Sequence, residues 1–286
     1  MLAGITLFWG LNWPGMKIIL SELTVWWFRA SCLWIGGICL LALAASGGSR
    51  LKLSFSEIRS VAWVAVFNVC CWHLLSAYAV SVMPAGRASI VAFTMPLWAT
   101  LFSAWLVKES VSSRKIIGLT FGITGLAVLI GPDLWILKKA PVGAISMLGA
   151  AIGWALGTVL FKKSTLNISI ATHIGWQLMI GAIPLTVGAF WLEPLPDVTQ
   201  LSTPVWLALI YIYIFPMVFC QWAYLKVVGM FPASIAAIGT MMIPVVGVYS
   251  SYLILDEAIG WRELLSLGLI CSALIIVLGQ KSALKK

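Results

Sequence analysis

The chain contains two copies of one unit. Residues of the first half recur in the second at an offset of 145 positions, which becomes 148 beyond residue 240. One small adjustment over the whole length is hard to obtain by chance, even in apolar sequence. We therefore expect a first repeat at 1–139 and a second at 140–286. The aligned pairs include Trp9 and Trp154, Lys17 and Lys162, Pro96 and Pro244, and Glu109 and Glu257.

The apolar content of both copies predicts an integral membrane protein. Hydrophobic residues make up 62% of the chain, charged residues only 9%, and the mean hydropathy is +1.04, whereas a soluble domain is about 25% charged. Ten apolar stretches approach the roughly 20 residues that span a bilayer as a helix. They cover 2–21, 24–45, 60–81, 86–107, 114–131, 141–161, 168–191, 204–226, 232–255 and 262–280. Transmembrane strands would alternate in polarity over about ten residues, so an all-α fold with ten transmembrane helices is expected.

Five helices in each repeat imply that the two copies are inverted relative to one another. With the N-terminus in the cytoplasm, the internal segments carry twelve basic residues and the external segments five. This bias places both termini in the cytoplasm and the protein in the inner (plasma) membrane. Two inverted repeats fused in one membrane chain are typical of a transporter core. Because one chain supplies both inverted halves, they are compatible with a functional monomer.

Several classes of function find no support in the sequence. No connection is long enough to form a domain, and no phosphate-binding glycine loop is present. His73 and His173 have no clustered carboxylates, and the six cysteines lie inside apolar runs without a CxxC pair. We therefore expect no enzyme activity, no cofactor, no metal site and no nucleic-acid partner. The expected partners are a small-molecule substrate and the lipid bilayer.

Three pairs of motifs give the chain a specific resemblance. They are Trp9-Gly10 to Lys17 with Trp154-Ala155 to Lys162; Met83 to Ser89 with Phe231 to Ser234; and Pro96 to Glu109 with Pro244 to Glu257. With these motifs the chain resembles EamA-type drug/metabolite transporters, and within that group it is similar to the YddG aromatic amino-acid exporters. The resemblance implies ten helices and transport of small metabolites. Pro96 and Pro244 are expected to kink the fourth and ninth helices, and Glu109 and Glu257, at helix ends beside bases, to act structurally.

Helix periodicity and the repeat select the residues expected to line a central path. Polar side chains are costly in lipid, so faces that carry them are expected to look inward. Amides, hydroxyls and indole groups in apolar walls suit a neutral or zwitterionic ligand with a flat apolar part. The same side chains could instead serve only helix packing or interhelical hydrogen bonds. The candidates are Trp9, Asn12, Trp13, His73, Ser76, Tyr78, Trp98, Trp154, Thr158, Tyr213, Gln221 and Tyr249.

These features favour a carrier that exports amino acids, aromatic and other neutral ones, and related small metabolites by alternating access. Small multidrug transporters that resemble this chain use a carboxylate in the first helix, whereas the corresponding faces here carry Asn12 and Thr158, and every acidic residue lies at or near the end of an apolar stretch. This argues against the first alternative, export of hydrophobic or cationic drugs by proton antiport. A membrane scaffold or sensor without transport is the remaining alternative.

Overall fold

The computed structural model describes residues 1–106, 108, 113–135, 142–163, 166–223 and 242–278. Within these residues every regular element is a helix and no strand occurs, so the predicted all-α class is confirmed. Six of the described helical stretches are long and apolar enough to cross a membrane, and shorter apolar helices accompany them. The protein is therefore a multi-span membrane protein.

Each of the ten apolar stretches carries helix where the chain is described. The first half contains α1 (Leu2–Ile19), α2 (Val25–Ser46), α3 (Phe55–Ala65), η1 (Val66–Cys71), α4 (Trp72–Val82), α5 (Ala85–Ala92), α6 (Met95–Leu106) and α7 (Ser113–Trp135). The second half contains α8 (Val142–Lys163), α9 (Ile170–Leu192), η2 (Val198–Gln200), α10 (Thr203–Ile214), η3 (Phe215–Cys220), α13 (Ile243–Leu255) and α14 (Trp261–Leu278). The third, fourth and eighth stretches are thus each built from consecutive helical segments.

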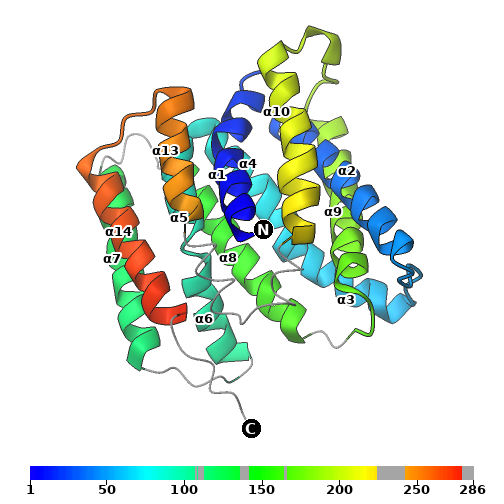
Figure 1. Cartoon of the computed structure of the whole chain (residues 1–286), viewed down its shortest axis with the longest axis horizontal. Helices are drawn as coiled ribbons and strands as arrows, with labels where there is room; N and C mark the ends of the chain where they lie inside the picture. The colour runs from blue at the N-terminus through cyan, green and yellow to red at the C-terminus, as the bar shows by residue number, and fades with distance from the viewer. Residues whose placement is uncertain (107, 109–112, 136–141, 164–165, 224–241, 279–286) are drawn as a thin grey trace.

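The packing of these helices follows the order of the repeats. Figure 1 shows α7 and α14 together at one end of the bundle and α2, α3 and α9 at the other, with α1 and α8 between them. The most extensive contacts join α2 to α9 and α7 to α14. Helix α1 packs on α13, α10 and η3, while α8, its counterpart in the second half, packs on α5, α6, α4 and η1. When the two halves are exchanged, the contact of α1 with α13 corresponds to that of α8 with α6, and the contact of α1 with α10 to that of α8 with α3.

A π-helical segment interrupts the third stretch at η1 and the eighth at η3. Such wide turns are rare and occur mostly at functional sites. In η3, Pro216 has no amide hydrogen to donate to the preceding turn. The two segments begin at Val66 and Phe215, about one helical turn beyond the 145-residue offset. A continuous apolar run gives no sign of a π turn, and the sequence did not predict either segment.

The fourth stretch is broken where a kink was expected. Pro96 cannot donate a backbone hydrogen bond to Ala92 four residues earlier, and α5 ends at Ala92 before α6 begins at Met95. Pro244 lies instead in the first turn of α13, where a proline needs no partner for its nitrogen. The residues that precede α13 in the ninth stretch lie outside the described part of the chain.

Two residues adopt the same uncommon backbone conformation at equivalent positions. Lys108 follows α6 with φ of 56°, and Asp256 follows α13 with φ of 54°. Left-handed φ is unusual for residues other than glycine, although aspartate adopts it more often than most. The 148-residue offset aligns these two positions, so the same helix ending is found in both halves.

Candidate substrate site

The first helix of each half contacts the π segment of the other half. Trp9 of α1 donates from its indole Nε1 to the Pro216 carbonyl in η3 at 3.3 Å. Asn68 of η1 donates from its amide to the carbonyl of Trp154 in α8 at 3.3 Å. Trp9 and Trp154 are repeat counterparts, so this pair of contacts lies at the junction of the two halves.

An aromatic pair lies beside the second of these contacts. The rings of Trp72 and Trp154 are 5.0 Å apart with an interplanar angle of 59°. The Trp154 carbonyl also accepts a hydrogen bond from the Thr158 hydroxyl at 2.8 Å. The α8 backbone can approach η1 closely because Gly157 has no side chain. A Cβ built on Gly157 would lie 2.7 Å from the backbone nitrogen of Asn68. The result is a half-buried surface of two indoles flanked by an amide and a hydroxyl.

The two remaining candidates on α1, Asn12 and Trp13, contact different parts of the bundle. Asn12 is half-buried and donates from Nδ2 to the Met16 sulfur at 3.2 Å. Trp13 is 4% exposed and packs against the position of Gly247, where an added Cβ would meet its ring at 2.8 Å. Trp13 is therefore held between α1 and α13, whereas Asn12 faces another group of residues.

That group surrounds Arg29, a buried guanidinium in the second turn of α2. Arg29 donates from Nη2 to the Met16 sulfur at 3.1 Å and to the Ser76 hydroxyl at 3.3 Å. His73 lies on α4 one turn before Ser76 and is close enough to interact electrostatically with Arg29. Arg29 Nε and His73 Nδ1 are buried and have no hydrogen-bond partner. Asn12, His73 and Ser76 thus converge on a residue that the sequence did not single out.

Arg29 was missed because its sequence position resembles that of an ordinary interfacial charge. It stands four residues after the first residue of α2, where a long side chain can reach the membrane surface. One signal was available, since Glu22, the nearest acidic residue in sequence, is seven positions away. No carboxylate could therefore neutralise Arg29 within its own helix.

The other candidates lie at varying distance from this group. Tyr213 of α10 donates its hydroxyl to Ser31 of α2 at 2.7 Å, and Gln221 is half-buried just beyond η3. Tyr78 and Tyr249 are 42% and 61% exposed. Neither tyrosine belongs to the buried group, in contrast to what their central position in the helices suggested.

Trp98 lies in a separate place in the fold. Its indole donates to Thr94 at 3.2 Å, and it lines a hollow of about 20 Å³ between α6 and α7 with Leu97, Gly122 and Ile123 among others. A space of this size accepts about one water molecule. Trp98 therefore faces α7, and the structure does not bring it together with Arg29.

One end of the bundle is held by carboxylates at helix N-termini, and we call it the Glu193 end. Glu193 accepts from the Thr24 hydroxyl and from the backbone amides of Trp26 and Trp27 at 3.3 Å each. Glu22 accepts from the Ser202 amide at 2.7 Å, and hydrogen bonds from the Ser202 side chain and then from this amide lower the pKa of the Glu22 carboxyl from its ordinary value. These contacts tie the connection after α1 to the connection after α9.

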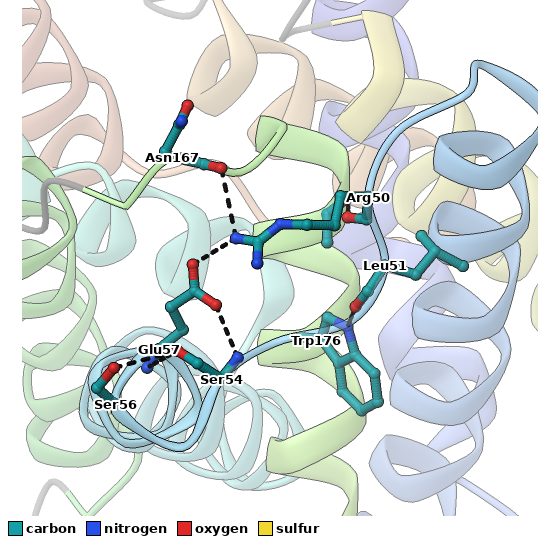
Figure 2. A network of polar contacts seen from close by, with 8 residues as sticks. Arg50, Leu51, Ser54, Ser56, Glu57, Asn167 and Trp176 are labelled. Carbon is teal, nitrogen blue, oxygen red and sulfur yellow. Dashed lines mark hydrogen bonds and ion pairs between the residues drawn. The ribbon is translucent and has the colours of Figure 1, made fainter.

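The opposite end is tied by the network in Figure 2, and we call it the Arg50 end. Arg50 forms an ion pair with Glu57, and Glu57 and Ser54 together form the capping box at the start of α3. Arg50 also donates to the Asn167 carbonyl at 3.5 Å. Trp176 of α9 donates from its indole to the Leu51 carbonyl at 2.9 Å. The connection between α2 and α3 is therefore anchored to the beginning of α9.

A bundle of apolar helices with a buried polar group inside it is typical of a membrane transporter, and comparison with known proteins assigns the family. The model of the EamA-like transporter family matches residues 1–131 and again 141–279. The chain belongs to this family. Its relatives are transporters and not enzymes, as expected from the sequence.

Individual relatives agree with this assignment. The uncharacterized transporter YvbV of Bacillus subtilis (strain 168) is 29% identical over 100% of this chain and 92% of its own length. A probable amino-acid metabolite efflux pump of Escherichia coli (strain K12) is 25% identical over 68% of this chain and 67% of its own. A solved structure described as a crystal structure of a protein has a TM-score of 0.67 at 19% identity, covering 96% of this chain and 95% of that one. This last likeness concerns the fold alone.

Proposed function

We propose that this transporter exports amino acids, aromatic and other neutral ones, and related small metabolites across the inner membrane. The observation that carries the proposal is the Trp72 and Trp154 pair, with rings 5.0 Å apart, next to the amide of Asn68 and the hydroxyl of Thr158. Indole faces bind flat apolar groups, and nearby amides and hydroxyls orient polar ones. The efflux pump named above, whose printed name refers to amino-acid metabolites, supports the same substrate class.

The binding residues would come from both halves. The side chains proposed to contact the substrate, directly or as the helices move, are Trp9, Asn12, Trp13, His73, Ser76, Trp154, Thr158, Tyr213 and Gln221. They lie on α1, α4, α8 and α10 and just beyond η3, helices that pack on one another across the repeat boundary. A substrate at this junction would be held by both repeats.

The mechanism we propose is alternating access, in which the unit 1–139 rocks against the unit 140–286. Three observations support two equivalent units. Helix contacts recur when the two halves are exchanged, and Trp9 and Trp154 each contact the π segment of the other half. The left-handed residues Lys108 and Asp256 lie at equivalent positions. In this proposal both termini lie in the cytoplasm, so the Arg50 end is cytoplasmic and the Glu193 end external. Breaking the polar ties at one end while those at the other remain would expose the proposed binding residues to one side at a time.

Flux through proteoliposomes tests the proposal. Vesicles loaded with phenylalanine, tryptophan or threonine should release it through the reconstituted protein, and Trp154→Ala should slow release of the aromatic ones by about tenfold. Trp191→Ala is the matched control, because Trp191 is 85% exposed at the end of α9; its flux should equal that of the unchanged protein. Absence of amino-acid flux would refute the proposal.

The same vesicles separate this function from drug antiport. A cationic dye moving only under a pH gradient would support proton-coupled drug export. The described carboxylates argue against that outcome, since those that make contacts hold helix ends or loops, as Glu193 and Glu57 do. A central carboxylate that could exchange a proton for a cation is absent from the described residues.

A further inference from the structure

Arg29 is a buried positive charge whose contacts are all weak or neutral. The side chain is 3% exposed, and its guanidinium lies 4.6 Å from the centre of the Phe28 ring. Its acceptors are the Ser76 hydroxyl and the Met16 sulfur, with the Cys32 thiol also beside it, and sulfur is a poor acceptor. Nε makes no hydrogen bond. A buried guanidinium with five N–H donors normally faces a carboxylate or phosphate, so this arrangement is incomplete.

The acidic residues whose side chains the structure describes are engaged elsewhere or exposed. Most of these carboxylates accept hydrogen bonds from helix N-termini or connecting segments, or pair with basic residues near the ends of the bundle. Asp256 is exposed. The engaged carboxylates are Glu22 with Ser202, Glu57 with Arg50 and Ser54, Glu193 with the start of α2, Asp197 with Thr199, Glu257 with the start of α5, and Glu263 with Arg87. None of these carboxylates contacts Arg29. An unneutralised buried charge costs several kcal/mol, so the protein retains Arg29 against a substantial penalty.

Neighbouring groups add further unused hydrogen-bonding capacity around Arg29. Asn12 and Arg29 both donate to the same Met16 sulfur, at 3.2 and 3.1 Å. His73 contributes a buried Nδ1 without a partner. Donors from α1 (Asn12) and α2 (Arg29) therefore converge on the thioether sulfur of Met16. A carboxylate placed there would accept hydrogen bonds from both.

We propose that Arg29, assisted by Asn12 and Ser76, is the subsite that binds the carboxylate of the transported substrate. The site is closed in this conformation, and movement of α1 or α4 away from α2 would admit the ligand. This proposal rests on the export function above and restricts it: the substrates carry a carboxylate.

The position of the aromatic pair agrees with a single ligand that occupies both places. Ser76, which contacts Arg29, follows Trp72 by four residues on α4, so both side chains lie on one face of that helix. The two positions are about 6 Å apart along the helix axis. A carboxylate at Arg29 would therefore leave a flat side chain within reach of Trp72 and Trp154. Arg29 aligns with Ile174 in the second repeat, so the subsite exists once per chain.

Three ligands of similar shape test the subsite: phenylalanine, 3-phenylpropionate, which lacks the ammonium group, and phenethylamine, which lacks the carboxylate. Binding to the purified full-length protein is measured from the ligand-dependent rise in melting temperature. We expect Arg29→Met to weaken binding of phenylalanine and phenylpropionate at least tenfold, because a charge-assisted hydrogen bond is lost, and to leave phenethylamine unaffected. Arg59→Met, which removes an exposed arginine of α3, should change none of the three.

Stability provides a second readout that separates binding from a structural role. Without ligand, Arg29→Met should melt at or above the temperature of the unchanged protein, because it replaces an unneutralised charge with an apolar chain of similar length. Arg29→Lys keeps the charge but not the planar fork, and it should bind phenylpropionate less tightly than the unchanged protein. Equal binding of phenylpropionate by Arg29→Met and the unchanged protein would overturn the proposal.

The flux assay keeps the two proposals apart. Phenylalanine export that is the same with and without Arg29 would preserve the export function and remove the carboxylate subsite. Phenylpropionate binding that depends on Arg29, in a protein that moves no amino acid, would preserve the subsite and refute amino-acid export.

Discussion

Lys17 and Glu257 hold opposite sides of the same bend, at Met83 and Pro84 between α4 and α5. Lys17 of α1 donates from its ammonium to the carbonyls of Val80 and Met83 at 2.8 and 3.1 Å. Glu257, just after α13, accepts from the amides of Ala85 and Gly86 at 2.7 and 2.9 Å. The cation satisfies the end of one helix and the anion the start of the next, as the helix dipoles favour.

Replacing Glu257 tests the contribution of this contact. Glu257→Ala leaves two amides at the start of α5 without their acceptor, and we expect a loss of about 1–2 kcal/mol in stability. The measurement is the melting temperature of the purified protein in detergent. The neighbouring change Asp256→Asn is the control, because asparagine also tolerates the left-handed backbone of that exposed position. Equal melting of Glu257→Ala and the control would contradict the structural role.

The repeat extends this prediction to Glu109, which lies outside the described residues. The 148-residue offset aligns Glu109 with Glu257, and each follows a residue with left-handed φ, Lys108 or Asp256. We therefore expect Glu109→Ala to lower the melting temperature by about as much as Glu257→Ala does. If Glu109→Ala is neutral while Glu257→Ala destabilises, the two repeats are not equivalent at this position.

Acid should weaken the contact between Glu22 and Ser202 at the Glu193 end. The Ser202 hydrogen bonds lower the pKa of the folded Glu22 carboxyl below its ordinary value of 4.5. A lowered pKa in the folded state stabilises the protein above the unfolded pKa, and this stabilisation is lost as the pH falls through the folded pKa. Between pH 7 and pH 3 the melting temperature should therefore fall further for the unchanged protein than for Glu22→Gln. Parallel pH curves would show that the contact contributes nothing.

The sequence was sufficient to predict the helices, because a segment inside lipid must satisfy its backbone hydrogen bonds internally. The apolar runs therefore located the spans, and Pro96 located the break after α5. The η1 segment could not be predicted, since it has no proline or glycine to distinguish it from ordinary helix. Its closeness to α8 depends on Gly153 and Gly157, which are distant from it in sequence.

Helical faces selected predicted site residues that the structure brings together, whereas helix centres selected residues that it keeps apart. Asn12, His73 and Ser76 are grouped in the structure, but Tyr78 is exposed. Tyr78 is two residues from Ser76, which corresponds to about 200° around a helix, so the two cannot share a face. Arg29 required knowledge of which helices pack on α2, and neither composition nor periodicity contains that information.

Close packing of α8 against η1 gives a final prediction. A Cβ at Gly157 would lie 2.6 to 2.9 Å from the Cβ, nitrogen and Cα of Asn68, and backbone atoms cannot move aside cheaply. We expect Gly157→Ala to lower stability by about 1–3 kcal/mol through overpacking and to displace Asn68 from the Trp154 carbonyl, reducing flux as well.

Gly268 provides the matched control for this change. It lies in α14, and a Cβ built there meets nothing within 4 Å. Gly268→Ala should therefore leave flux unchanged and raise stability slightly, since alanine loses less backbone freedom on folding than glycine. The comparison is made from melting temperature and phenylalanine flux of the two variants side by side. Full stability and flux in Gly157→Ala would mean that η1 and α8 are not packed as closely as the structure places them.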